Sequence, residues 1–404
     1  MMNQSPVGVV GVAALPKVDH QRDYQIAWGA TFLFFIAYYS LIVPLPRYLS
    51  DIGLSDGQMG LVLGATVIAS LLTRPISGIL TDRFGYKQML WWGALFLTLG
   101  GAGVIFTTQV ALLFGLRILQ ALGYVIFTTA GNALVGQLAT PAERSMKIAY
   151  FGLAANFAMT MTPGVIDTIL PWIGLTAAFW ITGGLAVSAG VLSRALRYTG
   201  EGQPITQLSA KAWLHLWRFP RELWLSIFVS ALFGAGFGAY FQFFAVLLER
   251  REIHPAGVVF AAYGLSIIVT RLLFGRYLDR IGFARVLALA VVMMVVGLAL
   301  AAVGFSLPIL IVAAALIAAG GGFFHPMLIA HHVTMLPSRA GWAVACFYFG
   351  FDAGIGIGAW ILGAILDVSG LTALFVAAAL LTLTILLFIP GLAQQRKALV
   401  AISG

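Results

Sequence analysis

The chain has 404 residues, of which 61% are hydrophobic and only 9% charged, and its formal net charge is +9. Soluble domains carry about 25% charged residues, and a globule with so few polar groups could not cover its surface with them. The composition therefore excludes a soluble globular protein and predicts an integral membrane protein.

Taken in chain order, the apolar segments predict twelve transmembrane helices, each near the ~20 residues that cross a bilayer. The predicted spans are 26–45, 57–80, 88–106, 110–138, 148–168, 172–193, 223–247, 257–277, 285–304, 308–331, 341–364 and 371–390. The predicted fold is an all-α membrane protein of two pseudo-symmetric six-helix bundles, 26–193 and 223–390. A cytoplasmic tail precedes them at 1–25, another follows at 391–404, and a cytoplasmic linker with an amphipathic segment joins them at 194–222.

The basic residues predict the orientation of these helices. If both termini are cytoplasmic, most Lys and Arg of the predicted loops lie on that side, Arg74 and Arg271 among them. The opposite loops hold only Arg47, Arg250 and Arg251. The positive-inside rule then predicts a multi-pass protein of the cytoplasmic (inner) membrane. We attribute the net charge to contact with the lipid bilayer and expect no nucleic-acid partner.

One phrase occurs twice in the chain. Thr73-Arg74-Pro75-Ile76-Ser77-Gly78-Ile79-Leu80-Thr81-Asp82-Arg83-Phe84-Gly85 returns as Thr270-Arg271-Leu272-Leu273-Phe274-Gly275-Arg276-Tyr277-Leu278-Asp279-Arg280-Ile281-Gly282. The Thr, Arg, Gly, Asp, Arg and Gly positions match at a constant spacing of 197 residues, nearly half of 404. Two equal membrane halves with matching loops are typical of a two-repeat transporter.

These residues also carry a family resemblance. Gly78-x-x-x-Asp82-Arg83-x-Gly85-x-Lys87 resembles the signature loop of the major facilitator superfamily. The segment 117–123 resembles a second motif of that family, with Ala121 where a Gly is usual, and 351–358 resembles a run common in bacterial efflux members. Thr162-Pro163-Gly164 keeps only the Pro of the motif of the drug antiporters. The resemblance implies a drug or metabolite transporter of the proton-antiporter type.

The repeated loops predict a cytoplasmic gate. Small glycines would let two helices approach closely, and each Asp would meet a helix N-terminus or a basic side chain of the other bundle. The gate residues are Gly78, Asp82, Arg83, Gly85, Lys87, Gly275, Asp279, Arg280 and Gly282. The alternative is that both loops only anchor the helices at the membrane surface.

Three ionisable residues at span depth are candidates for proton coupling. Asp352 is the twelfth residue of its span, near the bilayer midplane, where a carboxylate must pair or take up a proton. Arg117 lies about seven residues into span four, and the resemblance implies a role near the proton pathway; snorkelling toward the interface is the alternative. His325 follows three glycines, where the helix could break, and would line the cavity or exchange protons. The spacing of His325, His331 and His332 does not suit a metal, so no metal site is predicted.

Polar and aromatic side chains at the depth of the spans are candidates for substrate binding. They are Tyr38, Tyr39, Gln120, Asn132, Asn156, Tyr240, Gln242 and His325. Tyr38 and Tyr39 occupy roughly the same place in the first half as Tyr240 and Gln242 in the second. Interhelical hydrogen bonds are the alternative role for these side chains.

The chain has no phosphate-binding Gly-Lys-Ser/Thr loop and no His-Glu-x-x-His motif, so we predict neither an enzyme nor a cofactor. The proton gradient would supply the energy. The sequence thus favours a monomeric transporter that exports a small organic molecule in exchange for protons. Two alternatives stay open: a proton-coupled importer of a metabolite or organic anion that binds Arg117 and His325, and a non-transporting receptor or scaffold.

Overall fold

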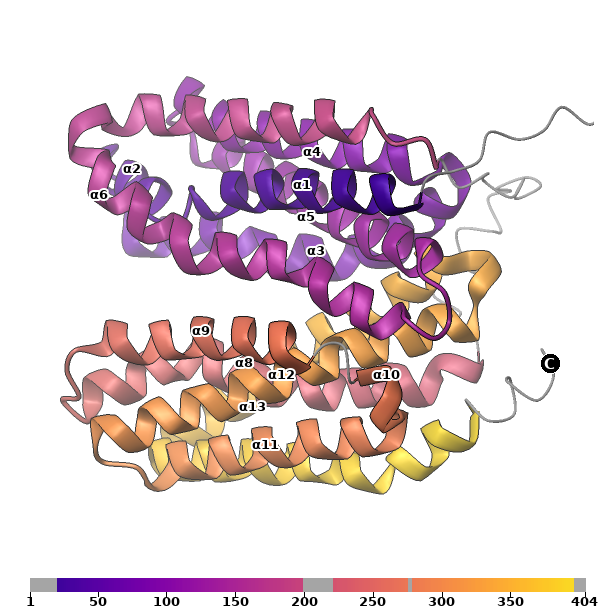
Figure 1. Cartoon of the computed structure of the whole chain (residues 1–404). Coiled ribbons are helices and arrows are strands. Elements are labelled where there is room, and N and C mark those ends of the chain that lie inside the picture. The colour runs from indigo at the N-terminus through magenta and orange to yellow at the C-terminus, as the bar shows by residue number, and fades with distance from the viewer. Residues whose placement is uncertain (1–19, 199–220, 275–277, 396–404) are drawn as a thin grey trace, which may run out of the picture.

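The computed structural model describes residues 20–198, 221–274 and 278–395, and this part of the chain forms two groups of helices (Figure 1). The first group holds α1 (His20–Tyr39), α2 (Pro44–Asp51), α3 (Asp56–Phe84), α4 (Tyr86–Ala102), α5 (Val110–Leu138) and α6 (Arg144–Ser193). The second holds α8 (Trp224–Arg250), α9 (Ala256–Phe274), α10 (Leu278–Ile281), α11 (Phe283–Val303), α12 (Leu307–Met335) and α13 (Ala340–Leu383). Most of the predicted linker, at 199–220, and the outer parts of both predicted tails, at 1–19 and 396–404, lie outside the described residues.

Two of these helices are each a pair of antiparallel helices. The backbone of α6 leaves helical geometry at Gly174 (φ 75°) and that of α13 at Gly370 (φ 82°), where the chain turns back (Figure 1). These positive φ angles suit glycine because it has no Cβ. Within the described residues, nine segments are long and apolar enough to cross a membrane, and both of these double helices are among them. With α3 added, the architecture is consistent with the twelve predicted passes.

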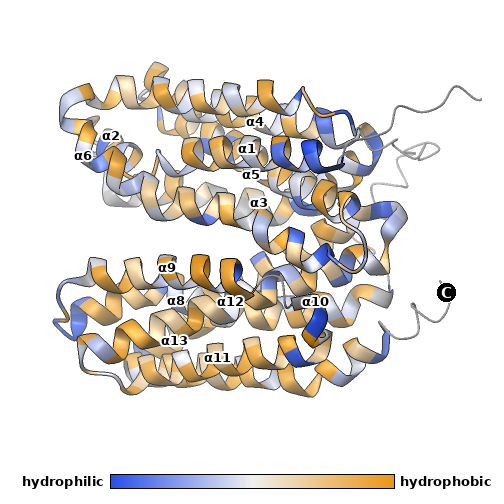
Figure 2. Cartoon of the chain, in the orientation of Figure 1, coloured by the Kyte–Doolittle hydropathy of each residue, from blue (hydrophilic) through white to orange (hydrophobic). Residues whose placement is uncertain are grey.

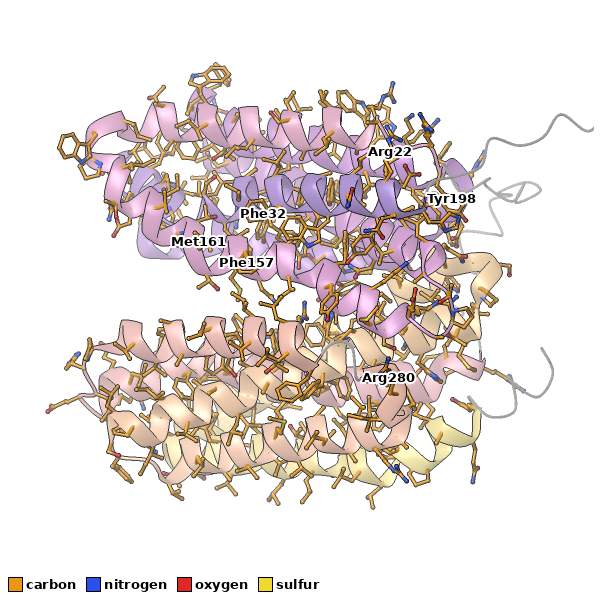
Figure 3. The ribbon with its side chains drawn as sticks, in the orientation of Figure 1. Arg22, Phe32, Phe157, Met161, Tyr198 and Arg280 are labelled. Carbon is orange, nitrogen blue, oxygen red and sulfur yellow. The ribbon has the colours of Figure 1, made fainter. Side chains whose placement is uncertain are left out.

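The two groups of helices are called the first and second half below, and their helix axes lie roughly parallel to one another (Figure 1). The start of α1 lies beside the residues that follow α6. The Asp23 carboxylate accepts hydrogen bonds there from the backbone N–H groups of Arg197 and Tyr198. Figure 3 shows Arg22, Tyr198 and Arg280 at this same end of the molecule, which we call the terminal end. Hydrophobic residues cover the length of the helices, and hydrophilic residues gather at the two ends (Figure 2). This distribution suits a protein that spans a bilayer.

Stacked phenylalanines occupy matching places in the cores of the two halves. The rings of Phe34 and Phe127 lie 3.9 Å apart in the first half, and those of Phe233 and Phe324 lie 3.7 Å apart in the second. Each pair is buried among the helices of its own half. Both halves therefore repeat the same packing, as the duplicated loop phrase predicts.

Candidate functional site

A cavity of about 380 Å³ lies between the two halves, within the range of about 300–1,000 Å³ typical of ligand sites. Its walls are mostly aromatic and come from helices of both halves. They include Phe35, Tyr39, Tyr124, Phe127, Phe151, Phe233, Phe237, Phe241, Tyr263, Tyr348 and Phe351. The polar and charged groups among the described lining residues are few: Thr31, Thr128, Asn132, Asn156, Arg271, His325 and Asp352, besides the tyrosine hydroxyls.

An ion pair joins the two halves at this cavity. The Nε atom of Arg74 on α3 lies 2.8 Å from the Oδ2 atom of Asp352 on α13. Arg74 is fully buried, whereas Asp352 is 20% exposed to the cavity. The guanidinium of Arg74 also donates to the Thr128 hydroxyl (2.9 Å) and lies 4.2 Å from the centre of the Tyr348 ring. These contacts fix Arg74, so Asp352 is the partner that water or a ligand can reach.

The prediction that Arg74 and Arg271 are loop residues is wrong. Helix α3 continues to Phe84, ten residues beyond Arg74, which places this arginine ~15 Å inside the helix end. Arg271 lies within α9 and lines the cavity. Both arginines were counted with the loop cations although the predicted spans 57–80 and 257–277 enclose them. A charge can lie deep in a bundle when a partner or a cavity meets it.

Arg271 is buried without a carboxylate partner among the described residues. Its side chain is 7% exposed, and its Nε atom has no hydrogen-bond partner within 20–198, 221–274 and 278–395. Gly152 on α6 leaves room for it, because a Cβ atom at that position would collide with the guanidinium. The amide nitrogen of Asn156 and the hydroxyl of Tyr263, two residues that line the same cavity, also lack hydrogen-bond partners in the part of the chain that the structure describes.

The three predicted proton-coupling residues are not together. Asp352 and His325 both line the cavity. The His325 ring meets the rings of Phe347 and Phe351 edge-on, with centroids 4.7 and 5.5 Å apart. Arg117 does not line the cavity: it lies on α5 seven residues before Tyr124, ~10 Å further toward the end opposite the terminal end. There its guanidinium donates a hydrogen bond to the Gln120 side chain.

Four of the predicted substrate-binding residues line the cavity, namely Tyr39, Asn132, Asn156 and His325. Asn132 also bridges the halves, since its amide donates to the Tyr348 hydroxyl at 3.1 Å.

The other four residues predicted to bind substrate lie outside the cavity lining. Tyr38 stacks on the cavity residue Tyr124 with ring centres 4.9 Å apart. Tyr240 stacks on Tyr263 at 4.4 Å. Gln120 is buried beside Arg117, and the exposed Gln242 donates to the carbonyl of Ile355 at 3.3 Å. These four residues therefore pack around the cavity wall or lie apart from it.

The first predicted gate loop closes the terminal end against the second half. The Asp82 carboxylate accepts the backbone N–H groups of Gly341 (2.7 Å) and Trp342 (2.9 Å), at the start of α13. Gly78 lets α3 approach the same residues closely, because a Cβ there would lie 2.6 Å from the Cβ of Ala345. The first N–H groups of a helix have no partner within the helix, and the Asp82 carboxyl satisfies two of them here.

For the other predicted gate residues the described structure gives no hydrogen bond or ion pair between the halves, although α10, which carries Arg280, packs against α6. Lys87 donates to the carbonyl of Leu196 in its own half at 3.1 Å, while Arg83 and Arg280 are exposed. Gly85 (φ 80°) and Gly282 (φ 95°) adopt the same left-handed conformation before α4 and α11, at matching positions of the repeat. Gly275 and the side chain of Asp279 lie outside the described residues.

Further contacts between the halves lie toward the terminal end. Arg144 on α6 donates to the Thr334 hydroxyl at 2.8 Å, and Gln137 on α5 donates to the carbonyl of Pro337. Toward the opposite end, Phe157 and Met161 project from α6 toward the second half, and Met161 is 58% exposed (Figure 3). The cavity is thus closed on the side of the terminal end.

The most prominent residue that the sequence analysis missed is Arg74, together with its counterpart Arg271. The signal was present, because both arginines occupy the same place in the repeated phrase. Their depth was not recognised, and neither was Tyr348, which contacts Arg74 from the other half.

Comparisons with known proteins agree with this architecture. The chain matches the family model described as Major Facilitator Superfamily over residues 27–254 and 251–401. It is 25% identical over 271 residues to "Multidrug resistance protein 2" of Bacillus subtilis. This alignment covers 62% of this chain and 66% of that relative, which is just under two thirds of its length. It is 25% identical over 292 residues to the "Multi-drug resistance efflux pump PmrA homolog" of Lactococcus lactis, covering 68% of this chain and 71% of the relative. The crystal structure of the human organic anion transporter MFSD10 (TETRAN) has the same fold, with a TM-score of 0.79, 17% identity and coverage of 92% of this chain and 99% of that one.

Proposed function

Because the chain belongs to the Major Facilitator Superfamily, we propose that it exports a small organic molecule across the cytoplasmic membrane in exchange for protons. The observation that carries this proposal is the buried ion pair between Arg74 and Asp352, which links the two halves at the central cavity. The export direction is supported by relatives named as multidrug resistance and efflux proteins.

The orientation in the membrane follows from the basic residues. Arg22, Lys87 and Arg194 lie at the terminal end or on the helix ends beside it, whereas Arg47 and Arg250 lie at the opposite ends of their segments. The positive-inside rule then places the terminal end and both termini in the cytoplasm. With this orientation, the structure is an outward-facing state that is closed to the cytoplasm by the contact between Asp82 and the start of α13.

The ion pair offers a direct means of coupling. Asp352 takes up a proton from the outer side, its carboxylate becomes neutral, and the attraction to Arg74 is lost in a site of low dielectric. The halves can then separate at the cytoplasmic end, where the proton leaves and the substrate binds. When Asp352 is ionised again, the ion pair re-forms and favours the outward-facing state. His325 lines the same cavity, and Arg117 lies ~10 Å nearer the outside, where its charge would influence the approach of protons.

Transport into everted membrane vesicles tests this function. Vesicles would be prepared from cells that express the wild type, Asp352→Asn or the control Asp367→Asn, which alters an exposed carboxylate of the same helix. Respiration acidifies the vesicle interior, and a panel of labelled organic compounds is added. We expect at least one compound to accumulate in wild-type and Asp367→Asn vesicles and to release part of the pH gradient, but not in Asp352→Asn vesicles. Accumulation only in right-side-out vesicles would establish import, and no movement in either orientation would favour a receptor or scaffold.

The contact of Asp82 with the start of α13 predicts that closure of the terminal end depends on pH, independently of Asp352. Asp82 lies beyond the predicted span 57–80, and burial raises the pKa of its carboxyl from 3.8 to about 6 although the N–H groups of Trp342 and Gly341 oppose the change. In a cytoplasm-open state, the same carboxyl would be in water with a pKa near its ordinary value. The closed state therefore binds the proton more tightly, so protonation stabilises closure below about pH 6, and this contribution is lost as the pH rises through about 6.

Distances between spin labels at the terminal end measure this effect. Labels would be attached at Gln88→Cys and Ser338→Cys, two exposed positions in different halves, in a Cys346→Ser and Asp352→Asn background. That background removes the native thiol and the other carboxylate that links the halves. We expect the closed population to increase as the pH falls from 7 to 5, and Asp82→Asn to remove most of the increase. An unchanged pH response in Asp82→Asn would contradict the assignment.

A further inference from the structure

The two central arginines have different partners although they occupy equivalent places. Arg74 and Arg271 are 197 residues apart in the repeated phrase. The helices that face them can be aligned in the same way. Asn156 lies 12 residues after Arg144, where α6 begins, and Asp352 lies 12 residues after Ala340, where α13 begins. Both also lie 18 residues before the glycine at which their helix turns back, Gly174 or Gly370.

Asn156 therefore stands in the first half where Asp352 stands in the second. The Arg74 guanidinium is neutralised by Asp352 across the interface between the halves. Arg271 faces α6, where the equivalent side chain is a neutral amide, and in the described structure no carboxylate pairs with it. With Asp352 already paired, the charged side chains Arg74, Arg271 and Asp352 give the cavity a net charge of +1 while His325 is neutral.

The donors around Arg271 are built into the cavity rather than left at a surface. Arg271, Asn156 and Tyr263 are 7%, 8% and 3% exposed, and each has a donor atom for which the described residues offer no hydrogen-bond partner. Burying one donor without an acceptor is unfavourable, and burying an unpaired charge more so. Gly152 preserves the space for the guanidinium. Three unpaired donors that line one cavity, one of them charged, match a ligand that brings an anionic acceptor.

The other side chains that line the cavity indicate the chemistry of the rest of the ligand. Phe35, Phe151, Phe237 and Phe241 line the cavity, whose volume of about 380 Å³ suits a molecule of one or two rings. We infer that the substrate is a small organic anion with an apolar or aromatic body, whose carboxylate or sulfonate pairs with Arg271 and accepts a hydrogen bond from Asn156. This inference names the substrate class and rests on the proposed function of the cavity as a transport site.

Equilibrium binding to the purified full-length protein in detergent tests the inference. Three probes share one ring system: 1-naphthoate is an anion, 1-naphthamide is neutral, and 1-naphthylmethylammonium is a cation. We expect the wild type to bind 1-naphthoate at least tenfold more tightly than either of the others. Arg271→Gln should weaken the binding of 1-naphthoate at least tenfold and leave that of 1-naphthamide nearly unchanged. The control Arg250→Gln, which alters an exposed arginine, should change neither.

Asn156→Asp is a second variant, which does not depend on the stability of Arg271→Gln. It places a carboxylate at the position equivalent to Asp352, where it can pair with Arg271 and take the place of the anion. We expect it to melt at the wild-type temperature or above it and to bind 1-naphthoate at least tenfold more weakly. The inference is overturned if 1-naphthoate does not bind at millimolar concentration, if the cation binds as tightly, or if Asn156→Asp binds 1-naphthoate like the wild type. Anion binding without proton-coupled movement in vesicles would refute the proposed function alone, and proton-coupled export of cations would refute this inference alone.

Discussion

Replacing Asp352 by Asn is expected to abolish proton-coupled transport and to destabilise the outward-facing state. The substitution removes the group that we propose takes up the proton, and it leaves Arg74, which is fully buried, without the counter-charge of Asp352. Breaking a buried ion pair from one side typically costs about 3–5 kcal/mol. Thermal unfolding in detergent measures the loss of stability, and uptake into everted vesicles driven by a pH gradient measures the loss of transport.

A double-mutant cycle separates the pair from its two members. Arg74→Gln alone should destabilise the protein less than Asp352→Asn, because Asp352 is partly exposed and can be hydrated or protonated. The double variant Arg74→Gln/Asp352→Asn should recover part of the stability, since no unpaired charge is left, but it should not recover transport. Asp352 does not act through Arg74 if the losses of stability in the two single variants are additive. The same conclusion follows if the double variant still exchanges its substrate for protons.

Replacing Gly78 by Ala is expected to prevent closure of the terminal end and to reduce transport at least tenfold, a fold-change worth about 1.4 kcal/mol. The added Cβ would lie 2.6 Å from the Cβ of Ala345, 2.8 Å from the carbonyl oxygen of Gly341 and 2.9 Å from the Cα of Trp342. Two of these three atoms belong to the backbone, so a change of side-chain rotamer cannot relieve the overlap. The halves must separate instead, which destabilises the closed state relative to the open one.

The only cysteine of the chain reports this separation. Cys346 is buried beside Ile79 and Trp342, in the packing between α3 and α13. We expect maleimide to modify it at least tenfold faster in Gly78→Ala than in the wild type. Gly115→Ala is the matched control, because a Cβ at Gly115 meets no atom of the described chain within 4 Å. This variant should be labelled by maleimide and should transport like the wild type. Equal labelling in the wild type and both variants would show that the contact at Gly78 does not close this end.

Most of the fold could be predicted because membrane spans are a local property. A helix that crosses a bilayer needs ~20 consecutive apolar residues, and that requirement is visible without knowing the neighbours of the helix. The segment predicted at 110–138 coincides with α5, and two predicted boundaries between spans fall beside Gly174 and Gly370. The repeat of 197 residues likewise predicted two halves that pack in the same way.

The site was only partly predictable. The sequence singled out Asp352, His325, Asn132 and Asn156, all of which line the cavity, because polar residues in apolar spans stand out. It also singled out Gln242 and Arg117, which do not line the cavity, since the same signal cannot show which face of a helix meets the other half. Arg74 and Arg271 were counted with the loop cations although they fall within the predicted spans 57–80 and 257–277, because nothing along the chain shows that Asp352 or a cavity meets them.

By itself, the sequence determined the membrane class of the protein, its helical spans, its duplication and its family resemblance, all of which depend on composition and on patterns along the chain. The tertiary structure alone decided that Arg74 pairs with Asp352, 278 residues away. It also decided that Arg271 lies against Gly152 and lines the cavity together with Asn156, with no carboxylate partner in the described part of the chain. Such partners are set by how two bundles pack against each other. The energy of a buried charge depends on which groups that packing brings within a few ångströms of it, and no spacing along the chain records this.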